Sequence, residues 1–99
     1  MFGAYAISKA ADLQLARNLA LEWGKHGIRV NCIAPGLVKT HFAKALWDNP
    51  ETLKSALASS PLNMIGEPQD IAGPALLLAS PAITGATIVV DGGATIGGA

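Results

Sequence analysis

The stretch Gly27-Ile28-Arg29-Val30-Asn31-Cys32-Ile33-Ala34-Pro35-Gly36 decides the fold class of this chain. Its apolar and β-branched residues predict a strand from Ile28 to Ala34, and Pro35-Gly36 predicts the turn that ends the strand. Good helix formers precede it from about Ala4 to Lys25, with apolar residues at helical spacing. Gly27 is suited to the left-handed cap of such a helix. The sequence therefore predicts a long helix followed directly by a strand.

The rest of the chain continues this alternation. Two short helices are expected at His41–Trp47 and Pro50–Ala58, and a third from Pro68 toward Ala79, because a proline costs no hydrogen bond in the first turn. The β-rich run Ala86–Val90 predicts a second strand, closed by the turn Asp91-Gly92-Gly93. This α/β pattern implies parallel strands joined by crossovers. Because two such strands alone would leave open edges, we expect them to be part of a larger sheet.

The composition bounds the class of protein. The chain has 99 residues, of which 51% are apolar, enough for one small domain with a core. Seven basic and seven acidic residues give a net charge of zero, so neither nucleic acid nor an anionic membrane is an expected partner. The single cysteine, Cys32, is expected to be a small buried hydrophobe, and no metal site is predicted. Since no leader sequence and no membrane-spanning apolar run is visible, we expect a soluble, cytoplasmic protein.

A phenol and an ammonium lie four residues apart in the first predicted helix, at Tyr5 and Lys9. Side chains at this spacing share one helix face. The positive charge would lower the pKa of the phenol from about 10, so that Tyr5 could pass a proton to or from a substrate oxygen. Taken alone, the pair also fits an aromatic core residue and a solvated lysine that pairs with Asp12.

The chain resembles the short-chain dehydrogenase/reductase family, in the subgroup of oxoacyl-carrier-protein-reductase-like and carbonyl-reductase-like enzymes. The resemblance covers essentially the whole chain and rests on five motifs in order. They are Tyr5-x-x-x-Lys9, the run Gly27 to Thr40, Gly66-Glu67-Pro68, Ile83-Thr84-Gly85 and Val90-Asp91-Gly92-Gly93.

The resemblance implies that residues 1–99 are the C-terminal part of a single NAD(P)-binding Rossmann-type domain. Its fold class would be α/β, the C-terminal portion of a doubly wound parallel sheet that is incomplete as given. The implied activity is a carbonyl/alcohol oxidoreductase that uses NAD or NADP on a small-molecule substrate. Tyr5 matches the catalytic acid/base, and Lys9 matches the lysine that holds the nicotinamide ribose and assists the tyrosine. A homo-oligomer, either tetramer or dimer, is implied for the full-length parent.

Four further positions match the family's cofactor contacts. Pro35 and Gly36 match the turn that approaches the nicotinamide, Val38 the main chain that meets the carboxamide, and Thr40 a hydroxyl near carboxamide or pyrophosphate. A variable substrate loop is implied over about residues 37–66. Exposed apolar side chains in it fit a lid over substrate, with local packing as the alternative; they are Phe42, Leu46 and Trp47.

Other family features have no match in these residues. The catalytic serine, the Gly-rich phosphate turn and the residue that selects NAD or NADP are not found, so we expect a fragment that is inactive in isolation. Pro74 falls inside an expected helix, at a cost of roughly 3 kcal/mol unless the helix kinks. An alternative is a noncatalytic fragment that docks on an intact family member through its oligomerisation surfaces.

A few polar residues are expected to have structural or surface positions only. Asn31 is interpreted as a hydrogen-bonded anchor in a buried strand, and Asp91 as the residue that ties the last turn together. His26 and His41 have no partner at metal or triad spacing, so both are expected at the surface.

Overall fold

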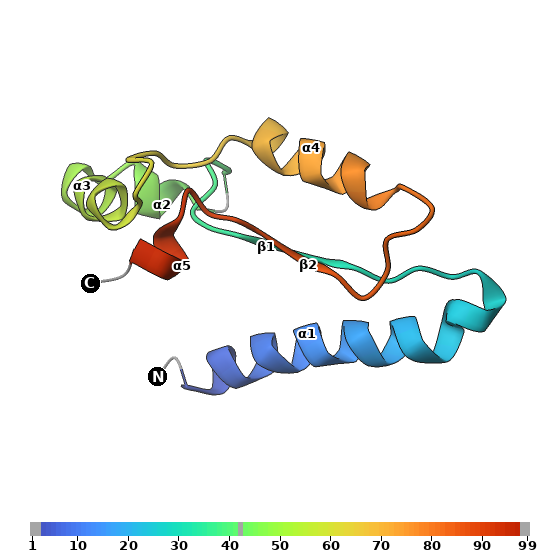
Figure 1. Cartoon of the computed structure of the whole chain (residues 1–99). Helices are drawn as coiled ribbons and strands as arrows, with labels where there is room; N and C mark the ends of the chain where they lie inside the picture. The colour runs from blue at the N-terminus through green and yellow to red at the C-terminus, as the bar shows by residue number, and fades with distance from the viewer. Residues whose placement is uncertain (1–2, 42, 98–99) are drawn as a thin grey trace. The chain divides into compact units, whose positions relative to one another are not determined.

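The computed structural model describes residues 3–41 and 43–97, and the chain divides into two compact units. The first unit contains the chain up to Cys32 together with Leu77–Ile88, and the second contains Ile33–Leu76 and the chain from Val89 onward. Figure 1 follows the elements along the chain from blue to red.

The first unit begins with the long helix α1, Gly3–Trp23, which the 3-10 turn η1, Gly24–His26, extends. Gly27 follows with φ of +74° and donates its N–H to the carbonyl of Gly24 at 2.9 Å. Glycine adopts this left-handed conformation with the least strain, so the residue ends the helix as the sequence predicts. His26, in η1, is exposed, as expected.

Strand β1 is Cys32–Pro35, so the predicted start at Ile28 is wrong by four residues. Ahead of it, side-chain hydrogen bonds accompany the backbone bond from the N–H of Gly85 to the carbonyl of Val30 at 2.8 Å. Val30 donates its N–H to the hydroxyl of Thr84 at 3.0 Å, and the side chain of Asn31 bonds the main chain of residues 83 and 86. The predicted role of Asn31 as a polar anchor is thereby confirmed, although the residue precedes the strand. Cys32 is half-buried.

Strand β2 is Thr87–Val90 and pairs with β1 in a two-stranded sheet. Cys32 donates to the carbonyl of Ala86 at 2.9 Å, and Gly36 donates to the carbonyl of Val90 at 3.0 Å. The same residue offset in both bonds means that the strands run parallel, as the α/β pattern predicts.

The second unit contains α2, Lys44–Trp47, and α3, Pro50–Ser59. Asn49 caps α3 by accepting the N–H groups of Glu51 and Thr52 at 2.9 and 3.2 Å. The predicted start of α2 at the exposed His41 is wrong by three residues, because the Thr40 hydroxyl accepts the N–H of Ala43 and starts the helix later. A four-residue helix that the sequence did not predict, α5, Ala94–Gly97, ends the described chain.

Helix α4, Pro68–Leu78, belongs mainly to the second unit and continues through Pro74. Asp70 accepts the N–H of Glu67 at 2.7 Å, which is one of the two side-chain bonds of a capping box at the helix start. In the first unit, Arg29 donates to the carbonyls of Leu78 and Ala79 at 2.6 and 3.0 Å. A guanidinium satisfies carbonyls that a helix end leaves without partners.

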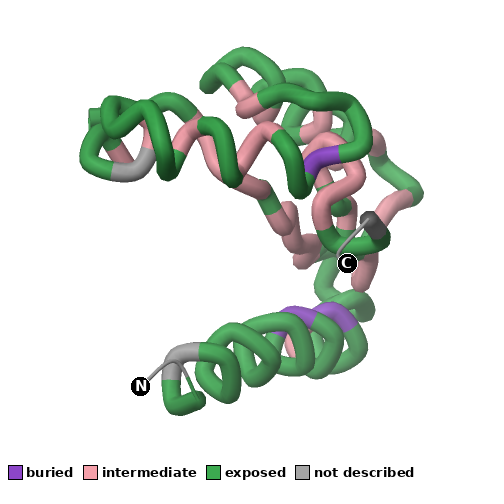
Figure 2. The backbone as a smooth tube through the Cα atoms, turned by 90° about the vertical axis from the view of Figure 1, so that its left-hand side faces the viewer, coloured by how far each residue is buried: buried purple, intermediate pink, exposed green. Residues whose placement is uncertain are grey.

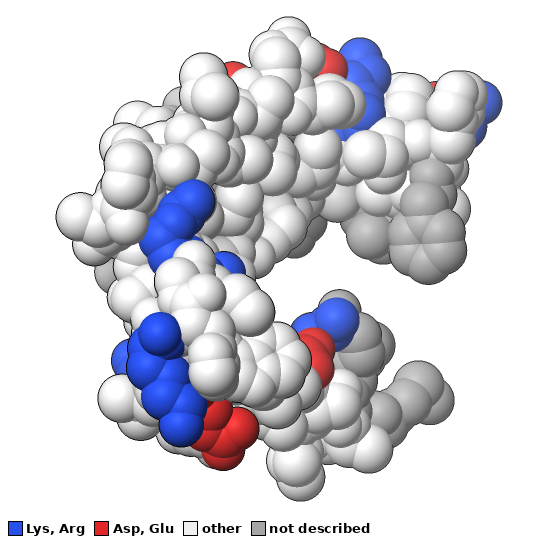
Figure 3. Space-filling model, turned by 90° about the vertical axis from the view of Figure 1, so that its right-hand side faces the viewer, with Lys and Arg blue, Asp and Glu red and all other residues white. Residues whose placement is uncertain are grey.

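Burial is sparse in the described residues. Ala16 and Ala20 are the buried apolar side chains, whereas Leu21 is 83% exposed and Leu76 is 77% exposed. Figure 2 shows α1 exposed along almost its whole length. On the face drawn in Figure 3, Lys, Arg, Asp and Glu form scattered groups among uncharged residues. Among the helices of the described residues, none combines the length and apolarity needed to cross a membrane.

Candidate functional site

Helix α1 carries both residues of the predicted acid/base pair. The backbone of Tyr5 lies in the first turns of α1, and its side chain lies outside the described parts of the structure. Lys9 follows one turn later, with Nζ 3.8 Å from Oδ2 of Asp12. Both side chains of that ion pair are more than half exposed, and exposed pairs contribute only about 0–1 kcal/mol. The contact with Asp12 is the one that the alternative interpretation expected, and it is weak enough to be exchanged for another ligand.

Gly36 follows directly after β1 and packs against Asp91 in the second unit. A Cβ on Gly36 would stand 2.8 Å from Cβ and 2.9 Å from Cα of Asp91, closer than real carbon atoms approach. The sequence linked this glycine to an approach of the cofactor. The structure adds a second reason for glycine at this position, which is the close passage of the chain at the end of β2.

Val38 pairs with Gly66 in an isolated parallel bridge. Lys39 donates to the carbonyl of Gly66 at 2.8 Å, and Gly66 donates to the carbonyl of Leu37 at 2.8 Å. In this parallel bridge the hydrogen bonds to Gly66 are made by Leu37 and Lys39, the residues on either side of Val38. The N–H and C=O of Val38 itself therefore point to the side of the chain away from Gly66. The described residues provide no backbone partner for these two groups. A donor and an acceptor are thus presented side by side on one extended residue.

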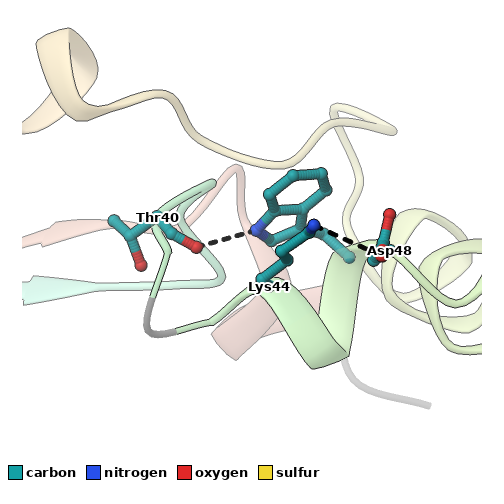
Figure 4. Close-up of polar contacts among 4 residues, drawn as sticks. Thr40, Lys44 and Asp48 are labelled. Carbon is teal, nitrogen blue, oxygen red and sulfur yellow. Dashed lines mark hydrogen bonds and ion pairs between the residues drawn. The ribbon is translucent and has the colours of Figure 1, made fainter.

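Thr40 lies two residues further on and is held by α2. Its hydroxyl accepts the N–H of Ala43 at 3.2 Å, and its carbonyl accepts the indole Nε1–H of Trp47 at 3.0 Å. Figure 4 shows this indole contact beside the pair formed by Lys44 and Asp48 on the same helix. Since the hydroxyl accepts a bond from Ala43, its own proton remains available to donate.

The turn after β2 ties the second unit together. Asp91 accepts the N–H of Gly93 at 2.8 Å and the N–H of Thr95 at 2.9 Å, and it also accepts the hydroxyl of Thr95. These bonds, the Thr95 hydroxyl first, hold the pKa of the Asp91 carboxyl below its ordinary value because they stabilise the charged form. The predicted structural role of Asp91 is confirmed.

Ser60 was missed by the sequence reasoning. Among the described residues, Ser60 is the polar residue that is buried. Its hydroxyl donates to the carbonyl of Gly92 at 3.0 Å. Gly92, with φ of +64°, leaves room for it, since a Cβ there would stand 2.6 Å from Oγ of Ser60. A cavity of about 120 Å³ lies beside this contact, lined mainly by apolar side chains such as Leu37 and Met64. The Gly92-Gly93 doublet was the available signal for such close packing.

The predicted lid residues are described only in part. Phe42 lies outside the described residues, and so does the side chain of Leu46. Trp47 is half-buried, and Nζ of Lys39 lies 4.9 Å from the centre of its ring. Lys9 belongs to the first unit, and the segment from Pro35 to Thr40 belongs to the second. The acid/base part and the cofactor-contact part of the predicted site therefore lie in different units.

The family model for Enoyl-(Acyl carrier protein) reductase matches residues 1–95 of the chain. The chain belongs to the short-chain dehydrogenase/reductase family. It is 46% identical to galactitol 2-dehydrogenase (L-tagatose-forming) of Cereibacter sphaeroides, over 93% of this chain and 37% of that protein. It is 45% identical to dehydrogenase/reductase SDR family member 4 of Bos taurus, over 92% of this chain and 34% of that protein. The chain therefore spans about a third of the length of the curated relatives it matches.

Solved structures of short-chain dehydrogenases give the same result for the fold. The structure of 4-hydroxyisoleucine dehydrogenase complexed with NADH matches 94% of this chain and 40% of its own, at 36% identity and a TM-score of 0.88. A putative gluconate dehydrogenase from Agrobacterium tumefaciens matches 91% of this chain and 37% of its own, at 39% identity and a TM-score of 0.84. The predicted fold class, part of a Rossmann-type α/β sheet, is confirmed.

Proposed function

We propose that this chain is the C-terminal part of a nicotinamide-dependent oxidoreductase that interconverts a carbonyl and an alcohol. A bound NAD or NADP would supply or accept the hydride at the substrate carbon. Tyr5 would donate a proton to the carbonyl oxygen during reduction and take it back during oxidation. Lys9, one helical turn away, would stabilise the phenolate form of Tyr5 and bind the ribose hydroxyls of the cofactor.

The observation that carries the proposal is the edge formed by Val38 and Thr40. A carboxamide has one carbonyl acceptor and one NH₂ donor, and it needs a complementary donor and acceptor. The N–H and C=O of Val38 face away from the bridge with Gly66, and the hydroxyl of Thr40 retains a proton to donate. These groups fit the nicotinamide carboxamide, and Pro35-Gly36 would lead the chain past the ring.

The proposal concerns the whole protein of which these residues form part. We propose a small-molecule carbonyl or alcohol as substrate, a cytoplasmic location, and a dimer or tetramer as the working state. The helical segment with Phe42, Leu46 and Trp47 would close over the substrate. Because the chain carries no match to the Gly-rich phosphate turn or the catalytic serine, we expect the isolated 99 residues to bind the cofactor weakly and to be inactive.

A cofactor titration of the isolated chain tests the proposal. After circular dichroism has established that the chain is folded, NADH is added to ¹⁵N-labelled protein up to millimolar concentration. We expect NADH to shift the amide resonances of Val38 and Thr40, whereas ADP-ribose, which keeps the pyrophosphate but lacks the nicotinamide, should leave that of Val38 in place. A folded chain in which NADH and NADPH leave both resonances unchanged would contradict the proposed cofactor contacts.

The exposed apolar side chains favour a second candidate, a noncatalytic fragment that docks on an intact family member. Ile7 and Leu21 of α1 are 72% and 83% exposed, and Leu76 of α4 is 77% exposed. Sedimentation of the chain with purified galactitol 2-dehydrogenase of Cereibacter sphaeroides distinguishes the two candidates. If the chain docks, it should sediment as a complex with this relative, and the double variant Ile7→Ser/Leu21→Ser should no longer form that complex. If the two proteins sediment separately, docking on this relative is excluded.

A further inference from the structure

Thr40 makes one hydrogen bond at each end of α2, to Ala43 ahead of the helix and to Trp47 at its last residue. At the start of the helix, the hydroxyl of Thr40 accepts the N–H of Ala43 at 3.2 Å. At its end, the indole of Trp47 reaches back to the carbonyl of Thr40 at 3.0 Å, as Figure 4 shows. The loop residue and the helix therefore form one closed unit.

A third contact covers the face of the same indole ring. Nζ of Lys39 lies 4.9 Å from the ring centre of Trp47, within the range of a cation–π interaction. The main chain of Lys39 is held by its N–H, which donates to the carbonyl of Gly66 at 2.8 Å. The indole thus contacts both residues that follow Val38.

This closed unit determines where the Thr40 hydroxyl points. Thr40 is exposed, so the hydrogen bonds to Ala43 and Trp47, and not burial, hold its backbone and its χ1 angle. With the oxygen engaged as an acceptor for Ala43, the hydroxyl proton is left for an outside acceptor. Loss of the indole donor would free the Thr40 carbonyl and loosen the residue.

We propose that Trp47 is the positioning residue for Thr40. Through this contact, α2 would hold a residue of the cofactor site in place as well as cover the substrate. The inference rests on the proposed function, which supplies the carboxamide that Thr40 would contact. A lid movement would then carry the Thr40 hydroxyl with it, and cofactor contact and lid closure would be a single event.

The variant Trp47→Phe tests the inference, because it keeps an aromatic ring beside Lys39 and removes the Nε1–H donor. Trp23→Phe is the matched control: this tryptophan lies at the end of α1, in the other unit. Two quantities are measured on each folded ¹⁵N-labelled chain. The first is the hydrogen-exchange rate of the Ala43 amide, and the second is the ratio of dissociation constants for NADH and ADP-ribose.

We expect Trp47→Phe to speed exchange at Ala43 by about tenfold and to weaken NADH binding by about five- to tenfold, with ADP-ribose binding unchanged. Trp23→Phe should change neither quantity. Unchanged exchange at Ala43 would overturn the inference, and so would faster exchange with an unchanged NADH to ADP-ribose ratio. If the unsubstituted chain binds no dinucleotide, the proposed function fails, while the exchange rate at Ala43 still decides whether Trp47 holds Thr40.

Discussion

The side chain of Asn31 accepts the main-chain N–H of Ala86 through Oδ1, at 3.0 Å. Through Nδ2 the same side chain donates to the carbonyl of Ile83 at 2.9 Å. One amide therefore bonds two main-chain groups of the loop that leads into β2. This is how two chain segments more than 50 residues apart are joined just ahead of the short strands.

Replacing Asn31 by Ala should destabilise the first unit. The N–H of Ala86 would lose its partner in a half-buried setting, at a cost of about 1–3 kcal/mol, whereas the carbonyl of Ile83 would keep the guanidinium of Arg29 at 3.2 Å. Urea unfolding followed by circular dichroism measures the loss. The control is Asn18→Ala on the exposed face of α1, which should change the free energy of unfolding by less than about 0.5 kcal/mol. Equal effects of the two variants would show that Asn31 is not an anchor.

Gly36 and Gly73 form a matched pair for substitution by alanine. A Cβ on Gly36 would clash with Asp91, so Gly36→Ala should cost about 1–3 kcal/mol of unfolding free energy. Apart from its chain neighbours, a Cβ on Gly73 in α4 meets nothing within 4 Å, but the Pro74 ring that follows offsets the helix-propensity gain, so Gly73→Ala should change the unfolding free energy by less than about 1 kcal/mol. Thermal unfolding of both variants checks the difference. A neutral Gly36→Ala would contradict the close approach to Asp91.

The carboxyl of Asp91 gives a pH dependence with a definite sign. Its pKa is lowered from 3.8 because Thr95 and Gly93 bond the charged form. A carboxyl with a lowered folded pKa stabilises the fold at pH values above its unfolded pKa, and this contribution is lost as the pH falls through the folded value. Titration of the Asp91 side-chain carbon by NMR should give a pKa below 3.8, and Thr95→Val should raise it. An equal pKa in both chains would remove Thr95 as the cause.

Pro74 is the position in α4 where substitution should increase stability. The helix runs through it from Pro68 to Leu78, so the proline removes one internal hydrogen bond and crowds the preceding turn. Pro74→Ala should raise the free energy of unfolding by about 1–3 kcal/mol. Gln69→Ala, an exposed change in the first turn, should have almost no effect. A loss of stability in Pro74→Ala would show that the proline ring supplies essential packing.

The elements that the sequence predicted well have local signals. The left-handed cap at Gly27 and the helix starts at Pro50 and Pro68 depend on residues within one turn of the element. The predicted start of the strand at Ile28 failed because the residues ahead of Cys32 bond a distant loop largely through side chains, those of Arg29, Asn31 and Thr84. A pattern of apolar residues carries no information about such long-range competition.

The candidate site was also predictable only where its residues carry a local sequence signal. The run from Pro35 to Thr40 was found through its motif, but the parallel bridge of Val38 with Gly66 joins residues 28 positions apart, which no local spacing reveals. The hydrogen bond of Trp47 to Thr40 was also invisible, since a tryptophan in a variable loop fits a lid as well as an anchor. The roles of Tyr5 and Lys9 stay predictions.

The central claim is the acid/base role of Tyr5, and reconstitution of activity tests it most directly. The chain is combined with the N-terminal part of galactitol 2-dehydrogenase from Cereibacter sphaeroides, cut where its match to this chain begins, and assembly is verified by sedimentation. Oxidation and reduction of a panel of small alcohols and carbonyls is then followed by NADH and NADPH absorbance. The account predicts turnover by the assembled pair that Tyr5→Phe lowers by roughly 10²–10⁴-fold. An assembled pair without turnover, or one in which Tyr5→Phe keeps full turnover, would contradict it.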